Sequence, residues 1–288
     1  MSHSVVSARS RCLDWAFAIA GGGAAVGTLG TLAWIIWDLI RLGISGITWN
    51  FLTGEVESAG RGGGIGPVVV STLLILGCCL VVAVPAGMGC AVWLSEYVQR
   101  GSRLSRAISG GVDLLASVPS IVFGLFGMTF FSQVLGLGFS ILSGGLTLAC
   151  MILPILVRTT LSALGNLPSD LRSGAAALGL SRITALQKVL LPAAMPGVLV
   201  GIALGVGRAL SETAALVFTS GYSTRWPASL GESGRSLSVH IYDLAMNIPN
   251  GSSNASATAL VLLILIFVIN LTATGVADLW MRRLSATE

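Results

Sequence analysis

The chain has 288 residues, of which 54% are hydrophobic and 10% are charged, and its net charge at pH 7 is +4. Soluble domains are about half apolar and about a quarter charged, so this composition excludes a water-soluble globule. The 16 basic residues are scattered among apolar runs and form no basic patch, which argues against nucleic acid as a partner. The composition therefore predicts an all-α polytopic protein whose surroundings are a lipid bilayer.

Six apolar runs are long enough to cross a bilayer as helices. They cover residues 15–39, 67–95, 108–135, 139–165, 196–220 and 257–279. Six crossings place both termini on one side, and most of the basic residues lie close to that side. By the positive-inside rule, we expect residues 1–14 and 283–288 in the cytoplasm, with a single permease-like domain between them over residues 15–282. The first run lacks a small-residue cleavage site and is expected to be a retained span.

The inner connection, residues 166–192, is the least membrane-like part of the second half. It opens with a proline-serine-aspartate helix-start signal, and Gly179 is placed to form an elbow. Ser181 can then cap a second helical stretch, which Pro192 and Pro196 are expected to end. The pattern predicts a helix, a glycine elbow and another helix, which together could dock on a soluble partner.

Two further local patterns predict departures from straight spans. Pro85, Pro119 and Pro154 interrupt their apolar runs and predict kinks, because proline removes a helical hydrogen bond. On the outer side, residues 236–246 place apolar side chains at helical spacing, which favours a short helix over an ordinary connecting loop.

No enzymatic constellation is evident. The chain has two histidines, no H-E-x-x-H and no P-loop, so we predict no catalytic residue, no metal site and no cofactor bound by this chain. The informative charges are Arg208 and Glu212, four residues apart in the fifth run. A charge at mid-membrane depth costs about 2.5–3.5 kcal/mol, so both should face a polar interior or each other. Two interpretations are open: a structural ion pair, or an anion path lined by Arg208 and supported by Glu212.

The inner connection resembles a known motif. Residues 171–182 read L-R-S-G-A-A-A-L-G-L-S-R, and residues 189–198 read V-L-L-P-A-A-M-P-G-V. Together they resemble the EAA loop of ABC importer permeases, which seats in a groove of the ATPase. The resemblance implies that ATPase coupling involves Arg172, Ser173, Gly174, Ala175, Leu178 and Gly179. Ser173 stands where the family usually has glutamate, and Gly174 where it has alanine, so one candidate carboxylate contact to the ATPase is lost.

Three other stretches, residues 118–127, 208–219 and 236–242, resemble the PstA-type permease of bacterial phosphate transporters. The resemblance implies a type I importer (MetI-like) fold in the bacterial cytoplasmic (inner) membrane, and a transport role for Arg208 and Glu212. It implies as partners a second permease of PstC type, a dimer of PstB-type ATPases that carries the ATP and Mg, and a PstS-type phosphate-binding protein outside. Another oxyanion as cargo, such as sulfate, molybdate or phosphonate, stays open, as does a self-sufficient channel or secondary transporter.

Overall fold

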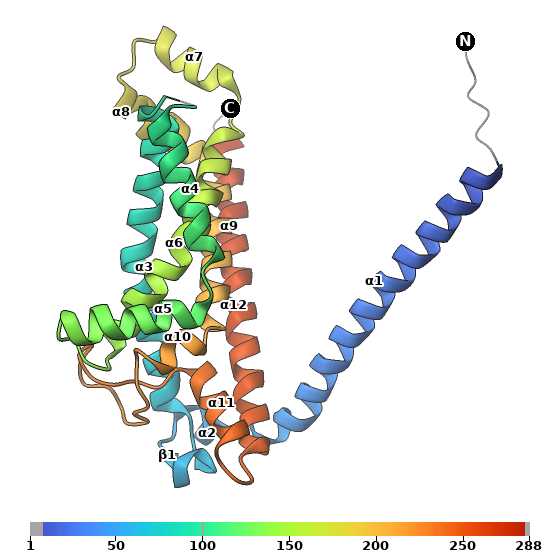
Figure 1. The fold of residues 1–288 in the computed structure, drawn as a ribbon, viewed down its shortest axis with the longest axis vertical. Coiled ribbons are helices and arrows are strands. Elements are labelled where there is room, and N and C mark those ends of the chain that lie inside the picture. Colours follow the sequence, from blue (N-terminus) through green and yellow to red (C-terminus); the bar gives the residue numbers. More distant parts are fainter. Residues whose placement is uncertain (1–7, 100, 286–288) are drawn as a thin grey trace.

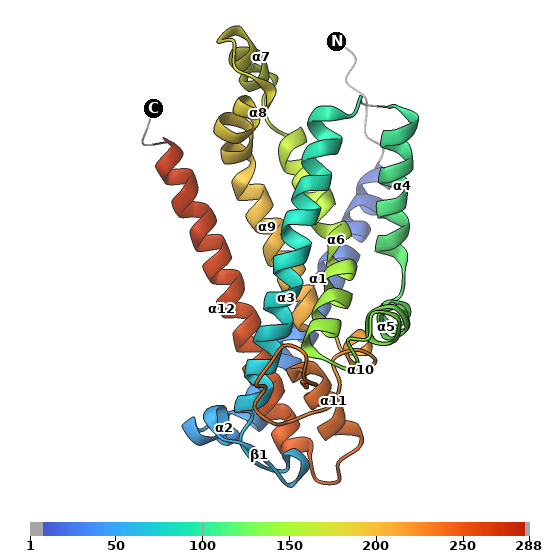
Figure 2. The same cartoon turned by 90° about the vertical axis from the view of Figure 1, so that its left-hand side faces the viewer.

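The computed structural model describes residues 8–99 and 101–285, and Figures 1 and 2 show it from two sides. The α-helices are α1 Ala8–Gly43, α2 Trp49–Thr53, α3 Gly66–Val92, α4 Arg103–Ser117, α5 Ser120–Gly127, α6 Ile141–Gly165, α7 Ser169–Ala177, α8 Arg182–Ala185, α9 Leu191–Leu210, α10 Ala214–Val217, α11 Leu237–Met246 and α12 Ser252–Ser285. Short 3-10 helices are η1 Ile44–Gly46 and η2 Ser58–Gly60, and π-helical turns are η3 Trp93–Tyr97, η4 Met128–Val134 and η5 Leu186–Leu190. Two short strands, β1 Val56–Glu57 and β2 Gly62–Gly63, pair antiparallel, with Val56 opposite Gly63.

The helices confirm the all-α membrane architecture. Five helices in the described part of the chain are long and apolar enough to cross a membrane. A sixth crossing comes only from a broken pair, α4 followed by α5 and η4, whose two parts meet at 99°. The predicted third span over residues 108–135 is therefore not one continuous helix, and its break falls at Pro119, where a kink was predicted. Proline lacks the N–H that would continue the ladder of α4. Pro85 and Pro154, in contrast, lie inside continuous helices.

The fifth span differs from the prediction at both ends. The structure runs α8, η5 and α9 together as one helix from Arg182 to Leu210, so neither Pro192 nor Pro196 ends it. Pro192 directly follows the π-helical turn η5, and local π-helical adjustment is one way in which a membrane span tolerates proline. The helix stops at Leu210, ten residues before the predicted end at 220.

The core lies where α3, α6 and α9 pack against one another. Ile152 and Leu156 of α6 are fully buried there, together with Ile75 of α3 and Val206 of α9. Small residues let α9 approach α6 closely: a side chain added at Gly201 would overlap Thr159. Close packing of this kind drives helix association in lipid, where water does not supply the attraction.

The two ends of the bundle differ in structure. α7 lies at the same end as the start of α1 and the end of α12, and α2, β1 and α11 lie at the opposite end (Figures 1 and 2). α1 leans away from the other spans and meets α12 near Gly43, which backs onto Ser256. The predicted short helix at residues 236–246 is confirmed as α11, and Ser236 caps it by accepting a hydrogen bond from the N–H of Val239.

Candidate functional site

The fifth span breaks next to Arg208 and Glu212. α9 ends at Leu210, residues 211–213 are not helical, and α10 starts at Ala214. The side chain of Ser211 donates a hydrogen bond of 3.0 Å to the carbonyl oxygen of Arg208. Serine and threonine compete in this way with the backbone ladder, which explains why a polar run interrupts an otherwise apolar helix. An interruption inside a membrane span needs partners for its freed backbone groups.

Glu212 makes two of the hydrogen bonds that satisfy backbone groups at the break. Its carboxylate oxygen Oε1 accepts a hydrogen bond of 3.4 Å from the N–H of Ala215, in the first turn of α10. Its carbonyl oxygen accepts a bond of 2.6 Å from the hydroxyl of Ser238, in α11. The residue therefore ties the break to the start of α10 and to α11.

Arg208 and Glu212 do not pair, so the interpretation of a structural ion pair is wrong. The i,i+4 spacing brings side chains together only on a continuous helix, and Glu212 lies beyond the end of α9. Among the described residues, ion pairs join Arg158 to Asp113, Arg172 to Glu96 and Arg235 to Asp243. Arg208 is exposed on the same face of α9 as Val200 and Leu204. Its guanidinium is thus available to a ligand or a neighbouring subunit.

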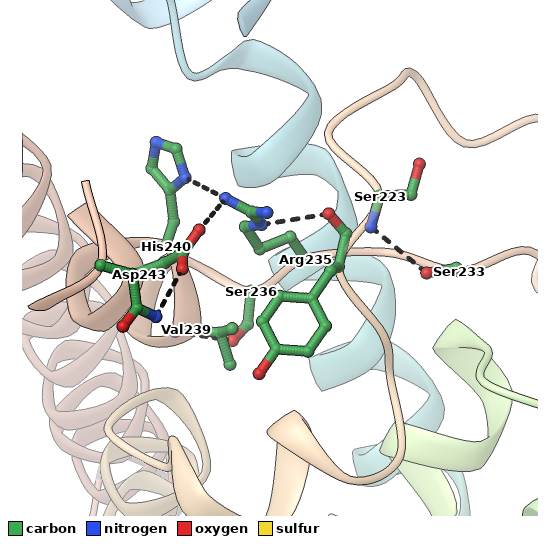
Figure 3. Close-up of polar contacts among 9 residues, drawn as sticks. Ser223, Ser233, Arg235, Ser236, Val239, His240 and Asp243 are labelled. Atoms are coloured by element: carbon green, nitrogen blue, oxygen red, sulfur yellow. Dashed lines mark hydrogen bonds and ion pairs between the residues drawn. The ribbon is translucent and has the colours of Figure 1, made fainter. Parts of the chain in front are cut away.

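A partly buried polar cluster joins the outer loop to α11 (Figure 3). Arg235 forms a 2.9 Å ion pair with Asp243, lies 3.4 Å from Nδ1 of His240, and donates a 3.1 Å hydrogen bond to the carbonyl of Tyr222. Its guanidinium also lies over the ring of Tyr222, 5.6 Å from the centroid. From the sequence alone, Arg235 is only a charge in an outer loop. Its partners in Figure 3 lie 5 to 13 residues away along the chain, so no short motif contains them.

The cluster shifts the protonation of its members. Burial, assisted by the nearby positive charge of Arg235 and opposed by a smaller effect of Asp243, lowers the pKa of His240 to about 4. Burial also lowers the pKa of Arg235, and Asp243 opposes this. His240 is fully buried, and its Nε2 atom has no hydrogen-bond partner among the described residues. It is therefore neutral at physiological pH.

The residues assigned to ATPase coupling divide into two groups on α7 and its elbow. Leu178 is 78% exposed, and Ser173, Gly174 and Gly179 are also exposed, so this group is free to meet a partner. Gly179 has a φ of +69°, the left-handed conformation that favours glycine at an elbow. Ala175 is buried, and Arg172 turns toward its own chain. Whether the exposed group contacts an ATPase stays a prediction.

Comparison with known proteins identifies the family. Residues 83–286 match the family of binding-protein-dependent transport system inner membrane components. The chain belongs to this family. It is therefore a multi-pass permease component of the cytoplasmic membrane.

Several relatives carry more specific names. The probable ABC transporter permease YqgI of Bacillus subtilis is 30% identical, with 86% of this chain and 89% of that protein covered. The phosphate transport system permease PstA of Haemophilus influenzae is 33% identical, with 74% and 75% covered. A PstA homologue of Mycoplasma pneumoniae is 36% identical over 62% of this chain, which spans 28% of that longer protein. The resemblance to PstA-type permeases expected from the motifs is confirmed.

Solved structures support the fold. A bacterial alginate ABC transporter in complex with its periplasmic protein has a TM-score of 0.67 at 17% identity, covering 92% of this chain and 94% of that chain. The MetNI methionine ABC transporter has a TM-score of 0.61 at 19% identity, covering 75% and 94%. The predicted MetI-like importer fold is thus confirmed.

Proposed function

We propose that this chain is the PstA-type permease subunit of an ATP-driven importer and that it passes inorganic phosphate across the cytoplasmic membrane. The observation that carries the proposal is the exposed guanidinium of Arg208 beside a break in a membrane span. The names of the relatives, which include several phosphate permeases, point to the same cargo.

The position of Arg208 supports an anion path. An arginine in a span is costly unless it faces water, a partner or a ligand, and Arg208 has no ion-pair partner among the residues described. Its planar fork stays charged at any physiological pH and matches the oxygens of phosphate. Glu212 supports the path by holding the break at which α9 ends.

The proposal requires partners. A PstC-type permease would supply the second half of the path, and a PstS-type binding protein would deliver phosphate from outside. A dimer of PstB-type ATPases would bind ATP and Mg and drive the change between outward-open and inward-open states. The exposed part of the α7 elbow, around Leu178, offers a contact for those ATPases.

The test is uptake of labelled phosphate at low external concentration, in cells whose only phosphate importer contains this chain. We expect Arg208→Gln to lower uptake by about tenfold or more, the effect of losing a hydrogen bond to a charged group. Arg208→Lys should retain part of the activity because it keeps the charge but not the fork. Arg41→Gln, which removes an exposed charge at the end of α1, is the matched control.

Three results would contradict the proposal. Unchanged uptake by Arg208→Gln at normal expression would remove Arg208 from the path. Suppression of phosphate uptake by excess sulfate, molybdate or phosphonate would reassign the cargo. Phosphate flux through the chain reconstituted alone in vesicles would replace the importer with a self-sufficient channel or secondary transporter.

A further inference from the structure

An ion pair ties the helix that resembles a coupling helix to the end of a distant span. Arg172 is the fourth residue of α7, and its Nη2 atom lies 3.0 Å from Oε1 of Glu96. The same nitrogen donates a 2.9 Å hydrogen bond to the carbonyl oxygen of Leu164. The two charged side chains are 29% and 17% exposed, so water screens the contact only in part.

The contact joins three structural elements. Glu96 lies in η3, the π-helical turn that ends α3, and Leu164 lies in the last turn of α6. Glu96 also accepts a 2.9 Å hydrogen bond from the hydroxyl of Ser95, which orients its carboxylate. π-Helical turns inside or at the end of helices are frequent at functional positions. Arg172 therefore links α7 to the ends of two core spans at once.

α7 has few other attachments to the bundle. Ala175 is its one buried residue, and the other residues of the helix are exposed or half-buried. Beneath the ion pair, Leu171 packs at the edge of a small apolar cluster around Leu164 and Leu190. A hydrogen bond between charged groups is shorter and stronger than a neutral one. Within the part of the chain that the structure describes, the pair is thus a directed contact between α7 and the ends of α3 and α6.

We propose that the Arg172–Glu96 pair transmits the movement of α7 to α3 and α6 during transport, an inference that rests on the proposed importer function. Arg172 is then a positioning residue within this chain and not a contact to the ATPase. The exposed residues of the elbow contact the ATPase, and Arg172 transmits the resulting displacement of α7 to α3 and α6. Loss of the pair leaves the ATPase able to bind and hydrolyse ATP but weakens the connection between hydrolysis and movement of the spans.

The test uses the complete transporter, with both permeases and the ATPase dimer, in proteoliposomes supplied with binding protein, phosphate and ATP. It measures phosphate transported per ATP hydrolysed. We expect Arg172→Gln and Glu96→Gln each to lower this ratio by about tenfold, the factor that corresponds to one charge-assisted hydrogen bond. The ATPase rate should stay within about twofold of wild type, because neither side chain belongs to the ATPase. The double variant should be no worse than Arg172→Gln alone, since that variant already removes the ion pair.

Controls separate this role from a merely structural one. Arg106→Gln removes an exposed charge from α4 and should leave the ratio unchanged. Arg172→Lys should restore part of the ratio, because lysine keeps the charge and one of the two hydrogen bonds. Copurification of the ATPase with each variant reports assembly. Reduced copurification that accounts for the whole loss of transport would overturn the proposal in favour of a structural role.

Other outcomes are equally decisive. A loss caused by Arg172→Gln but not by Glu96→Gln would refute the proposal, because the bond to Leu164 or an ATPase contact, and not the ion pair, would then carry the effect. An unchanged ratio in both variants would refute it as well. Failure of the proposed cargo is distinguishable, because it would appear in the wild-type transporter. In that case the ratio is measured with the anion that the wild type does carry.

Discussion

Ser238 offers a direct measure of how strongly the outer helix controls the break in the fifth span. A hydroxyl has one proton, and that of Ser238 goes to the carbonyl oxygen of Glu212 over 2.6 Å. Ser236, 2.9 Å away, must therefore donate to Ser238 while accepting from the N–H of Val239. A hydrogen-bonded chain thus runs from the first turn of α11 to the break beside Arg208.

The substitution Ser238→Ala removes the last link of that chain. Ser238 is 6% exposed, so bulk water does not readily replace its hydroxyl. An unsatisfied buried acceptor costs about 1–3 kcal/mol. If the break relaxes to recover a partner, the population of the original geometry falls by about 5- to 150-fold. Arg208 then lies in the wrong place for much of the time.

The assay is phosphate uptake as a function of external phosphate, which gives the maximal rate and the KM separately. We expect Ser238→Ala to lower the maximal rate, because the path itself is deformed, while capture by the binding protein is unaffected. Ser71→Ala is the matched control: Ser71 is also buried, and its hydroxyl has no hydrogen-bond partner within the described residues. An effect of Ser238→Ala no larger than that of Ser71→Ala would refute the reasoning.

Two further predictions concern stability. His240 binds its proton less readily folded, with a pKa of about 4, than unfolded, where the pKa is 6.5, so its contribution to stability is complete above pH 6.5. That contribution, about 3 kcal/mol, is lost as the pH falls from 6.5 to 4. Over this pH range the melting temperature of the wild type should therefore fall more steeply than that of His240→Gln. Parallel curves of melting temperature against pH would contradict this. Gly127→Ala should cost about 1–3 kcal/mol, because the added methyl overlaps Thr147. Gly89→Ala, which meets nothing within 4 Å, should be neutral or slightly stabilising in the same thermal assay.

The sequence predicts the spans well because the bilayer imposes a length and a composition on each of them. Breaks within spans are harder. Pro119 could be recognised, since proline leaves the helix few options, yet Pro196 lies inside a continuous α9. The break after Leu210 carried no proline, and the polar residues there also fitted a helix with an i,i+4 ion pair. The contact that favours the break over a continuous helix is the hydrogen bond from Ser238 to Glu212. Ser238 lies 26 residues further along the chain, so no local pattern contains this contact.

The candidate site shows the same limit. Motif resemblance identified Arg172 as part of a coupling loop. The orientation of its side chain, however, depends on Glu96, which lies 76 residues earlier in the chain. The Arg235 cluster was missed because each member, taken alone, is an ordinary polar residue of an outer loop. A basic residue immediately before a capped helix with an acidic residue on it was the one available signal, and it is weak.

The placement of these polar contacts bears on how the permease moves. In the middle of the bundle, α3 and α6 meet at small residues, where Gly87 faces Leu156 and Gly145 faces Cys78, so their separation has little room to change. At the ends, hydrogen bonds from Leu237 and Ser238 join α11 to the bundle, and those of Arg172 join α7 to it. Well-packed helices move as rigid bodies and do not deform continuously. We therefore expect α3, α6 and α9 to tilt together, with the changes in backbone conformation confined to the break at residues 211–213 and to the bend at Pro119.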